Sequence, residues 1–154
     1  MDLGLEGRRA IVTGGSKGIG FAIAKELVAE GATVRICARD ADDVAAAVAD
    51  LRRADAPAVT EPGARADGRA VDVRDADQLA AFVEWAAEST GGIDVLVNNA
   101  GGAHPGTFQT LEEEALVADF NIKVLSWFRA VKLALPWLRR SDSARVINIG
   151  SVYA

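Results

Sequence analysis

Short apolar runs that suit β-strands alternate along the chain with apolar residues at helical spacing. The runs are rich in β-branched residues and predict five strands, at positions 9–13, 33–37, 70–73, 93–97 and 145–149. Between the first two, the apolar positions at 21–28 predict a helix that Gly31 ends. Such alternation favours an α/β fold, in which right-handed crossovers build a doubly wound parallel sheet with helices on both faces.

Two segments depart from this alternation. Positions 52–69 are rich in Ala, Pro, Asp and Gly and predict a mobile surface loop inside one domain, because the alternation resumes directly after it. Positions 111–140 predict a long helix that is apolar on more than one face, so that both sides need to be covered. One side can pack on the sheet. The other favours a second copy of the chain, and we expect a homo-oligomer through the 111–140 helix.

Length and composition fit a single soluble domain covering residues 1–154. Half of the 154 residues are hydrophobic, which is enough for a core. The 17 Lys and Arg against 22 Asp and Glu leave a net charge of -5, which argues against a nucleic-acid surface. No apolar run reaches the ~20 residues that span a bilayer, and the first residues lack the features of a signal peptide, so a cytoplasmic protein without membrane contact is expected. One cysteine, Cys37, and one histidine, His104, exclude an internal disulfide and a Cys/His zinc site, and no metal is predicted.

A glycine-rich loop joins the first predicted strand to the first predicted helix. Its sequence is Thr13-Gly-Gly-Ser-Lys-Gly-Ile-Gly20, a T-G-x-x-x-G-x-G spacing. Glycines there permit a tight turn and close approach of the backbone, so that amide groups at the helix N-terminus can hold a pyrophosphate. The alternative is a glycine-rich turn without a ligand; the strand before the loop and the amphipathic helix after it favour the nucleotide site.

The order of these motifs resembles the short-chain dehydrogenase/reductase family, including its 3-oxoacyl reductases. The glycine loop is similar to the family's cofactor motif, and Asn98-Asn-Ala-Gly101 to its second signature. Asp72, Asn121 and Ser151 follow in the family's order and approximate spacing. The resemblance implies a Rossmann-like sheet and an NADP(H)-binding domain that is incomplete at the C-terminus and truncated after the fifth strand. A fragment, a truncated version or an interrupted gene would explain this ending.

The resemblance also implies which residues bind the cofactor. Asp72 would accept a hydrogen bond from the adenine amino group, with Val73 beside the ring. Asn99, Ala100 and Gly101 would pass under the adenosine ribose. The residues expected to line the phosphates and ribose are Gly14, Ser16, Lys17, Gly18, Ile19 and Gly20. The alternatives without a bound cofactor are that Asp72 only ends a strand and that Asn98 and Asn99 only form a turn.

Charge at the end of the second strand favours NADP(H) over NAD(H). NAD-selective enzymes place an acidic side chain there to bind the ribose 2′-hydroxyl, and this chain has Ala38 followed by Arg39. Arg39 and Lys17 are expected to converge on a 2′-phosphate. Asp40 weakens the prediction unless it caps the next helix. The alternative is that Lys17 and Arg39 are both solvated surface charges that bind no phosphate.

The catalytic residues implied by the resemblance are Ser151, which would bind the substrate oxygen, and Asn121, which would position a water for proton relay. Asn has a low helix propensity, so that a functional role would explain Asn121 within a helix. The alternative explanation is that Asn121 only marks a local kink of the helix. The family's Tyr-x-x-x-Lys pair does not follow Ser151 within the sequence, and Tyr153 is too near Ser151 to take the tyrosine's role. The implied parent is an oxidoreductase acting on a small carbonyl or alcohol substrate, a ketone or 3-oxoacyl thioester. The 154-residue chain alone is expected to be inactive. A non-catalytic nucleotide-binding module and an interaction protein remain alternatives.

Overall fold

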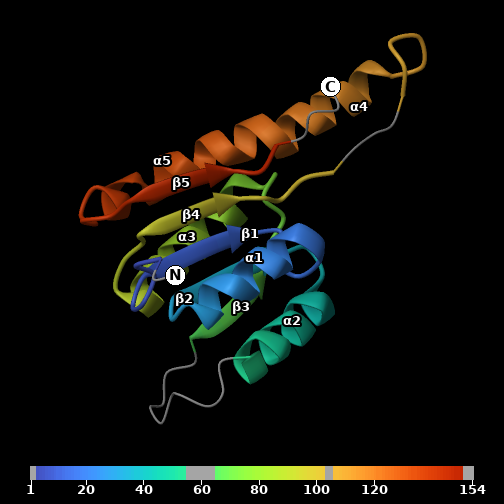
Figure 1. Ribbon diagram of the computed structural model, residues 1–154. Coiled ribbons are helices and arrows are strands. Elements are labelled where there is room, and N and C mark those ends of the chain that lie inside the picture. Colours follow the sequence, from blue (N-terminus) through green and yellow to red (C-terminus); the bar gives the residue numbers. More distant parts are fainter. Residues whose placement is uncertain (1–2, 55–64, 103–105, 151–154) are drawn as a thin grey trace.

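The computed structural model describes residues 3–54, 65–102 and 106–150. Within them the strands form one parallel sheet in the order β3-β2-β1-β4-β5 (Figure 1). The strands are β1 (Arg9–Thr13), β2 (Thr33–Ala38), β3 (Ala66–Ala70), β4 (Val95–Asn98) and β5 (Arg145–Asn148). The helical segments are α1 (Gly18–Ala29), α2 (Ala41–Ala54), α3 (Ala76–Thr90), α4 (Glu113–Phe120), η1 (Asn121–Leu125) and α5 (Ser126–Leu138). The predicted α/β class, a Rossmann-like doubly wound sheet, is confirmed.

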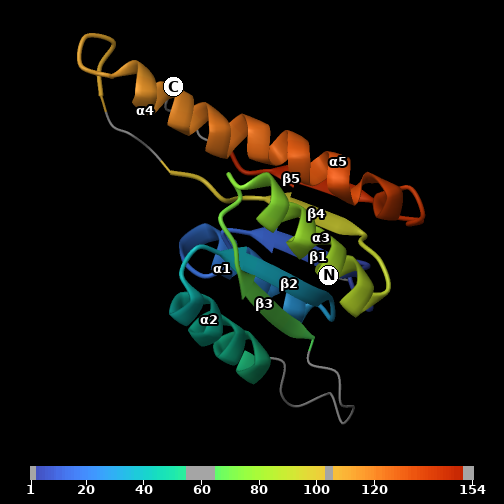
Figure 2. The same ribbon diagram turned by 180° about the vertical axis from the view of Figure 1, so that it is seen from behind.

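Two helical layers cover the two faces of the sheet. Helices α1 and α2 lie on the face seen in Figure 1, and α3 and α5 lie on the opposite face (Figure 2). Alternate residues of β1 divide between the layers, since Ala10 and Val12 belong to the core under α1 and α2 and Ile11 to the core under α3 and α5. Both faces are therefore buried at the central strand β1, as a parallel sheet requires, whereas all four residues of the edge strand β5 are exposed.

The third strand lies earlier than predicted, so its assignment to residues 70–73 was wrong. β3 spans Ala66–Ala70 and pairs with β2 from Val34 opposite Ala66 to Ala38 opposite Ala70. It also takes up the end of the predicted 52–69 loop. An edge strand pairs on one side only and tolerates polar residues, which is why its sequence did not resemble a strand. Gly68 permits close packing here, because a Cβ would lie 2.7 Å from an Ile36 side-chain carbon.

The fourth strand begins at Val95, two residues later than predicted, and Asp94 before it forms a hydrogen-bond network instead. Its buried carboxylate accepts hydrogen bonds from Arg9 Nε at 2.7 Å, from Arg9 Nη2 at 2.8 Å and from Ser141 Oγ at 2.6 Å. The Arg9 guanidinium holds the pKa of the Asp94 carboxyl well below its usual range. This network joins the starts of β1 and β4 to the turn before β5.

The predicted 111–140 helix is three consecutive segments rather than one regular helix. Helix α4 extends beyond the carboxyl ends of the strands (Figures 1 and 2), and none of its residues is buried. The π-helical η1 starts at Asn121, and α5 packs on the sheet through Ala130, Ala134 and Leu138. Apolar side chains remain exposed along the other side: Leu116, Val117, Phe120, Val124 and Phe128. The uncovered apolar side agrees with the sequence pattern, and the homo-oligomer stays a prediction.

The described residues also bear on two other classes of protein. No helix among them is long and apolar enough to span a bilayer. Nor do His, Cys, Asp and Glu side chains in the described ranges form a group of three or more that could hold a metal ion.

Candidate cofactor site

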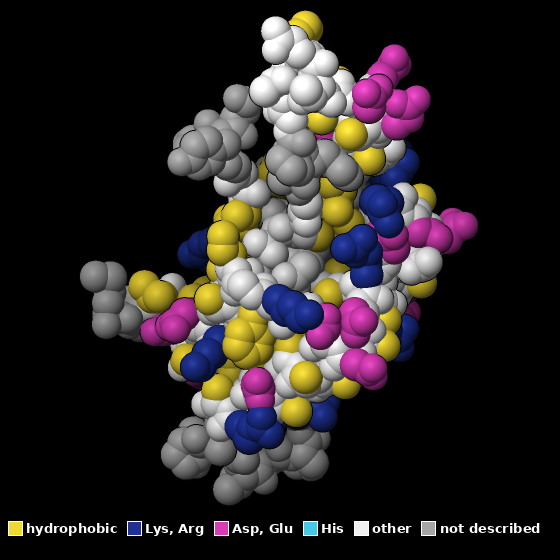
Figure 3. Space-filling model, turned by 90° about the vertical axis from the view of Figure 1, so that its right-hand side faces the viewer, with side chains coloured by type: hydrophobic (Ala, Val, Ile, Leu, Met, Phe, Trp, Pro, Cys, Tyr) yellow, Lys and Arg dark blue, Asp and Glu magenta, His cyan; other side chains and the backbone are white. Residues whose placement is uncertain are grey.

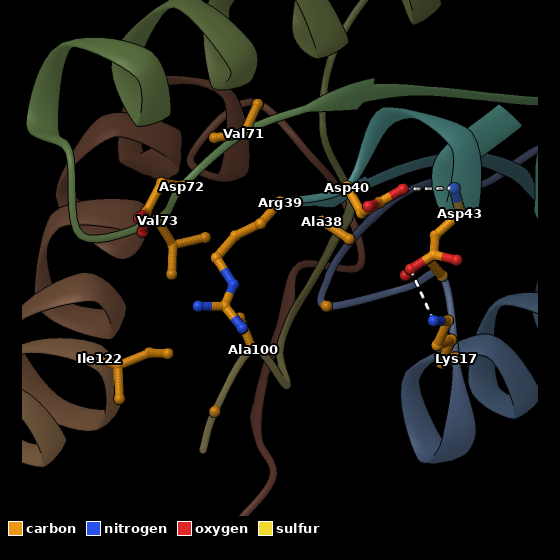
Figure 4. Close-up of a pocket in the computed structure, with 13 residues that line it drawn as sticks. Lys17, Ala38, Arg39, Asp40, Asp43, Val71, Asp72, Val73, Ala100 and Ile122 are labelled. Atoms are coloured by element: carbon orange, nitrogen blue, oxygen red, sulfur yellow. Dashed lines mark hydrogen bonds and ion pairs between the residues drawn. The ribbon is translucent and has the colours of Figure 1, made fainter.

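A cavity of about 600 Å³ opens at the carboxyl ends of the strands. In a doubly wound sheet a ligand crevice lies at this end, where the chain crosses from one side of the sheet to the other. Here that crossing falls between β1 and β4. Most of the cavity lining comes from four segments: the glycine loop, residues 38–40 at the end of β2, residues 71–73 after β3 and residues 100–101 after β4 (Figure 4). Asp43 of α2 and Ile122 of η1 complete the lining. Segments far apart in the sequence therefore meet at one site.

The glycine loop approaches its neighbours too closely for side chains. Gly14 has φ +65°, and a Cβ on it would lie 2.8 Å from the Ala100 Cα. A Cβ on Gly20 would lie 2.2 Å from the carbonyl oxygen of Gly14. Gly18 also has a positive φ, but a Cβ there would meet open space, so the backbone conformation alone requires glycine. Helix α1 begins at Gly18 without a side-chain cap from its N-cap Lys17, which leaves a helix N-terminus suited to an anion.

Two residues tie the glycine loop to the end of β4. Thr13 Oγ1 accepts hydrogen bonds from the backbone N–H groups of Asn99 and Ala100, both at 3.0 Å. In return, Asn99 Nδ2 donates to the carbonyl oxygens of Thr13 at 3.1 Å and Gly14 at 3.0 Å. The Asn99 side chain thus binds the loop, while Ala100 and Gly101 line the cavity. The Asn98–Gly101 segment is more than a turn, because it fixes the loop on which the cavity depends.

Asp72 lies on the β3 side of the cavity with Val71 and Val73. Arg74 Nη2 donates to its Oδ2 at 2.6 Å, and the Arg74 N–H donates to its Oδ1 at 3.0 Å. The Arg74 hydrogen bonds lower the pKa of the Asp72 carboxyl, so it is ionised at neutral pH and acts as an acceptor. An acceptor at this position is chemically suited to an amino group on an aromatic ring.

The opposite side of the cavity carries mixed charge. Lys17 Nζ lies 2.6 Å from Asp43 Oδ2, and this hydrogen-bonded ion pair raises the pKa of the Lys17 amino group. The Arg39 side chain extends into the cavity (Figure 4) and makes no hydrogen bond or ion pair with the described residues. Asp40 caps α2, the alternative role that its position in the sequence allows, since its Oδ1 accepts from the Asp43 N–H at 2.9 Å. Figure 3 looks onto this end of the molecule, where basic and acidic side chains lie next to one another.

The predicted catalytic residues are not brought together in the described part of the chain. Ser151 lies outside the described residues, as does His104. Asn121 starts the π-helical segment, and its carbonyl oxygen accepts from the Ser126 N–H. Asn121 lines a smaller cavity of about 330 Å³ on α4, while the next residue, Ile122, lines the main cavity. A π-helical turn commonly marks a functional site, and it also provides the local irregularity considered as the alternative.

Comparison with known proteins identifies the family. The family model described as short chain dehydrogenase matches residues 8–154. The chain belongs to this family. The 3-oxoacyl-[acyl-carrier-protein] reductase of rhamnolipid biosynthesis from Pseudomonas aeruginosa is 38% identical, over 96% of this chain and 56% of that protein.

Solved structures of the short chain dehydrogenase family share the fold. A short chain dehydrogenase from Burkholderia cenocepacia in complex with NADP has 36% identity and a TM-score of 0.84, covering 96% of this chain and 57% of that one. L-Sorbose reductase from Gluconobacter frateurii, complexed with NADPH and L-sorbose, has 32% identity and a TM-score of 0.89. That match covers 99% of this chain and 55% of the reductase. The chain spans about half the length of the relatives it matches.

The site contains predicted residues and others that sequence reasoning missed. Of the predicted cofactor residues, eight line the cavity: Gly14, Ser16, Lys17, Arg39, Asp72, Val73, Ala100 and Gly101. Gly18, Ile19, Gly20 and Asn99 lie beside it and do not line it. The missed residues include Asp43 and Ile122. Asp43 resembles any acidic residue in the first turn of a helix, and only the packing of α1 beside α2 brings it to Lys17.

Proposed function

We propose that this chain forms the cofactor-binding part of an NADP(H)-dependent oxidoreductase, which transfers a hydride between nicotinamide and a ketone or alcohol. The observation that carries the proposal is the cavity at the carboxyl ends of the strands, where the glycine loop meets Asp72 and Arg39. Two family members of known structure contain NADP or NADPH, which supports the same cofactor here. The name of the Pseudomonas relative makes a 3-oxoacyl thioester a candidate substrate.

The residues of the cavity suit the adenosine half of NADP(H). The N-terminus of α1 offers N–H groups to the pyrophosphate, and Gly14 lets the backbone come close to it. Ionised Asp72 accepts from the adenine amino group, and Val73 lies against the ring. Arg39, which makes no hydrogen bond or ion pair with the described residues, binds the 2′-phosphate, because guanidinium pairs well with phosphate.

Calorimetric titration with NADPH and NADH tests this assignment. We expect the wild-type chain to bind NADPH more tightly than NADH, and Arg39→Asp to remove that difference. Arg139→Asp, at an exposed arginine after α5, makes the same change of charge away from the cavity and leaves the preference intact. Equal affinity of the wild type for both nucleotides would refute the cofactor assignment.

The same proposal assigns the chemistry. The nicotinamide, when bound, supplies or accepts the hydride. Ser151 binds the substrate oxygen and Asn121 positions a water, as in the family. The 154-residue chain by itself contains no Tyr-x-x-x-Lys after Ser151, so a general acid is missing, and such a group contributes about 10²–10⁴-fold. We therefore expect this polypeptide to bind NADPH without oxidising it in the presence of ketones or 3-oxoacyl thioesters. Oxidation of NADPH by the 154-residue chain alone would contradict this assignment of the chemistry. If the whole protein binds the nucleotide but catalyses no hydride transfer, the alternative of a non-catalytic nucleotide-binding module would be favoured.

A further inference from the structure

An ion pair occupies the cavity at the place where the 2′-phosphate is expected. Lys17 from the glycine loop and Asp43 from the first turn of α2 both line the cavity, with Nζ and Oδ2 2.6 Å apart (Figure 4). The Asp43 backbone is held in place, because its N–H donates to the capping carboxylate of Asp40. The Asp43 side chain is 33% exposed, whereas that of Lys17 is 72% exposed. The carboxylate is therefore the more fixed member of the pair.

The charged side chains lining the cavity do not make it cationic. Lys17 and Arg39 are opposed by three carboxylates from the described lining residues, Asp40, Asp43 and Asp72. Asp72 is compensated by Arg74, and Asp40 by the helix that it caps. Asp43 is the carboxylate of this set that is paired with a cation required for the 2′-phosphate.

We propose that Asp43 is a specificity-determining residue, which limits the preference for NADPH by holding Lys17 and repelling the 2′-phosphate. The inference rests on the proposed function, since it concerns the cofactor of that same site. A phosphate monoester carries a charge of about -1.5 to -2 at neutral pH. It must displace the carboxylate from Lys17 or share the lysine with it. A ribose 2′-hydroxyl carries no charge and can donate a hydrogen bond to the same carboxylate, so NADH does not meet this opposition.

Replacing Asp43 should therefore strengthen binding of the phosphorylated ribose alone. Exposed charge pairs contribute little each, and a single contact of this kind changes an affinity by about two- to fivefold. The phosphate carries nearly two charges, so we expect a gain of about three- to tenfold. The gain should shrink at high salt, because the Debye length falls to about 3 Å at 1 M.

The probes are 2′,5′-ADP and 5′-AMP, which differ in the 2′-phosphate and occupy only the adenosine half of the site. Calorimetry on Asp43→Asn should show tighter 2′,5′-ADP binding by that factor, with 5′-AMP affinity changed less than twofold. Asp42→Asn is the matched control: it removes the same charge from the same turn of α2, at an exposed side chain outside the cavity lining, and should change neither affinity. Asp43→Ser, whose hydroxyl also suits a first turn, repeats the test if the amide variant does not fold.

The outcomes separate the two proposals. An unchanged ratio of the two affinities in both Asp43 variants overturns this inference alone, as does an equal gain in Asp42→Asn, which would indicate a general effect of net charge. Failure of every variant and of the wild type to bind either probe overturns the proposed function and this inference with it. A selective gain for 2′,5′-ADP that disappears at high salt supports Asp43 as the residue that limits the preference.

Discussion

Replacing Thr13 by valine tests whether one hydroxyl holds the glycine loop against the end of β4. Valine keeps the β-branched shape at the end of β1 and exchanges the hydroxyl for a methyl group. Thr13 is buried, and its Oγ1 accepts from the N–H groups of Asn99 and Ala100, both at 3.0 Å. Its own hydroxyl donates to the Val97 carbonyl at 3.4 Å, which is a weak contact. The substitution therefore leaves two partly buried N–H groups without an acceptor.

The expected loss of stability follows from these two donors. Each unsatisfied N–H in a buried place costs about 1–3 kcal/mol. Because both groups are only partly buried, the lower half of that range applies, and Thr13→Val should lower the free energy of unfolding by about 2–4 kcal/mol. In contrast, Thr13→Ser keeps the acceptor and removes one methyl group, at a cost of about 1 kcal/mol. The variant with the more conservative shape should thus be the less stable one.

Urea denaturation and thermal melting followed by circular dichroism measure this difference. For a chain of this length each kcal/mol corresponds to roughly 2–4 °C in Tm. Thr13→Val should also weaken nucleotide binding, because Ala100 and Gly14 line the cavity and lose their link. If Thr13→Val is as stable as Thr13→Ser, the hydroxyl is not the element that joins the loop to β4, and the reasoning is wrong.

Three other perturbations have defined outcomes. The pKa of the Asp94 carboxyl is depressed in the folded state, so its contribution to the free energy of unfolding is present above the unfolded carboxyl pKa of about 4 and is lost as the pH falls from there toward the folded pKa. Asp94→Asn should therefore lower the stability at pH 7 by about 2–3 kcal/mol and flatten the acid limb of a pH–stability curve. A steep acid limb retained in that variant would contradict this. Gly20→Ala should cost about 1–3 kcal/mol, because its Cβ meets the Gly14 carbonyl oxygen, and full stability in a urea titration would argue against the close approach. Sedimentation should find the wild-type chain self-associated through α4 and α5, and Phe128→Asp should reduce the association; a monodisperse wild-type monomer would reject the oligomer.

The sequence predicted the fold well where periodicity reflects burial on both sides. β1 and β2 are rich in apolar residues, interrupted in β2 by Arg35, because helices cover both faces of the sheet there, and their assignments hold to within a residue. The position of β3 was predicted wrongly because it is an edge strand in which Asp67, Gly68 and Arg69 do not have the apolar pattern of a strand. Its strand conformation comes from pairing with β2 and from the close contact of Gly68 with Ile36, which are tertiary effects.

The prediction of one long helix over residues 111–140 was wrong for a related reason. Its apolar residues were assigned to one regular helix, but a residue pattern does not distinguish an α-helix from one with a π-helical turn at Asn121. Within the site, motif spacing found the residues whose backbone forms the cradle. It missed Asp43, because the Lys17–Asp43 contact depends on how the first turns of two helices lie side by side, and no short-range pattern encodes that distance.

In the proposed function, binding of a nucleotide and choice between nucleotides have separate physical bases in the site. The cradle consists of backbone at the ends of the central strands β1 and β4, fixed by Thr13 and Asn99 and by glycines that admit no side chain. In the proposed function, choice between nucleotides depends on charged side chains that the cradle does not need for its shape: Lys17, Arg39 and Asp43. Substitutions in the cradle should therefore change stability and the affinity for every adenine nucleotide together. Substitutions among the three charged residues should change the ratio of affinities at nearly constant stability, so that cofactor preference can shift without disturbance of the fold.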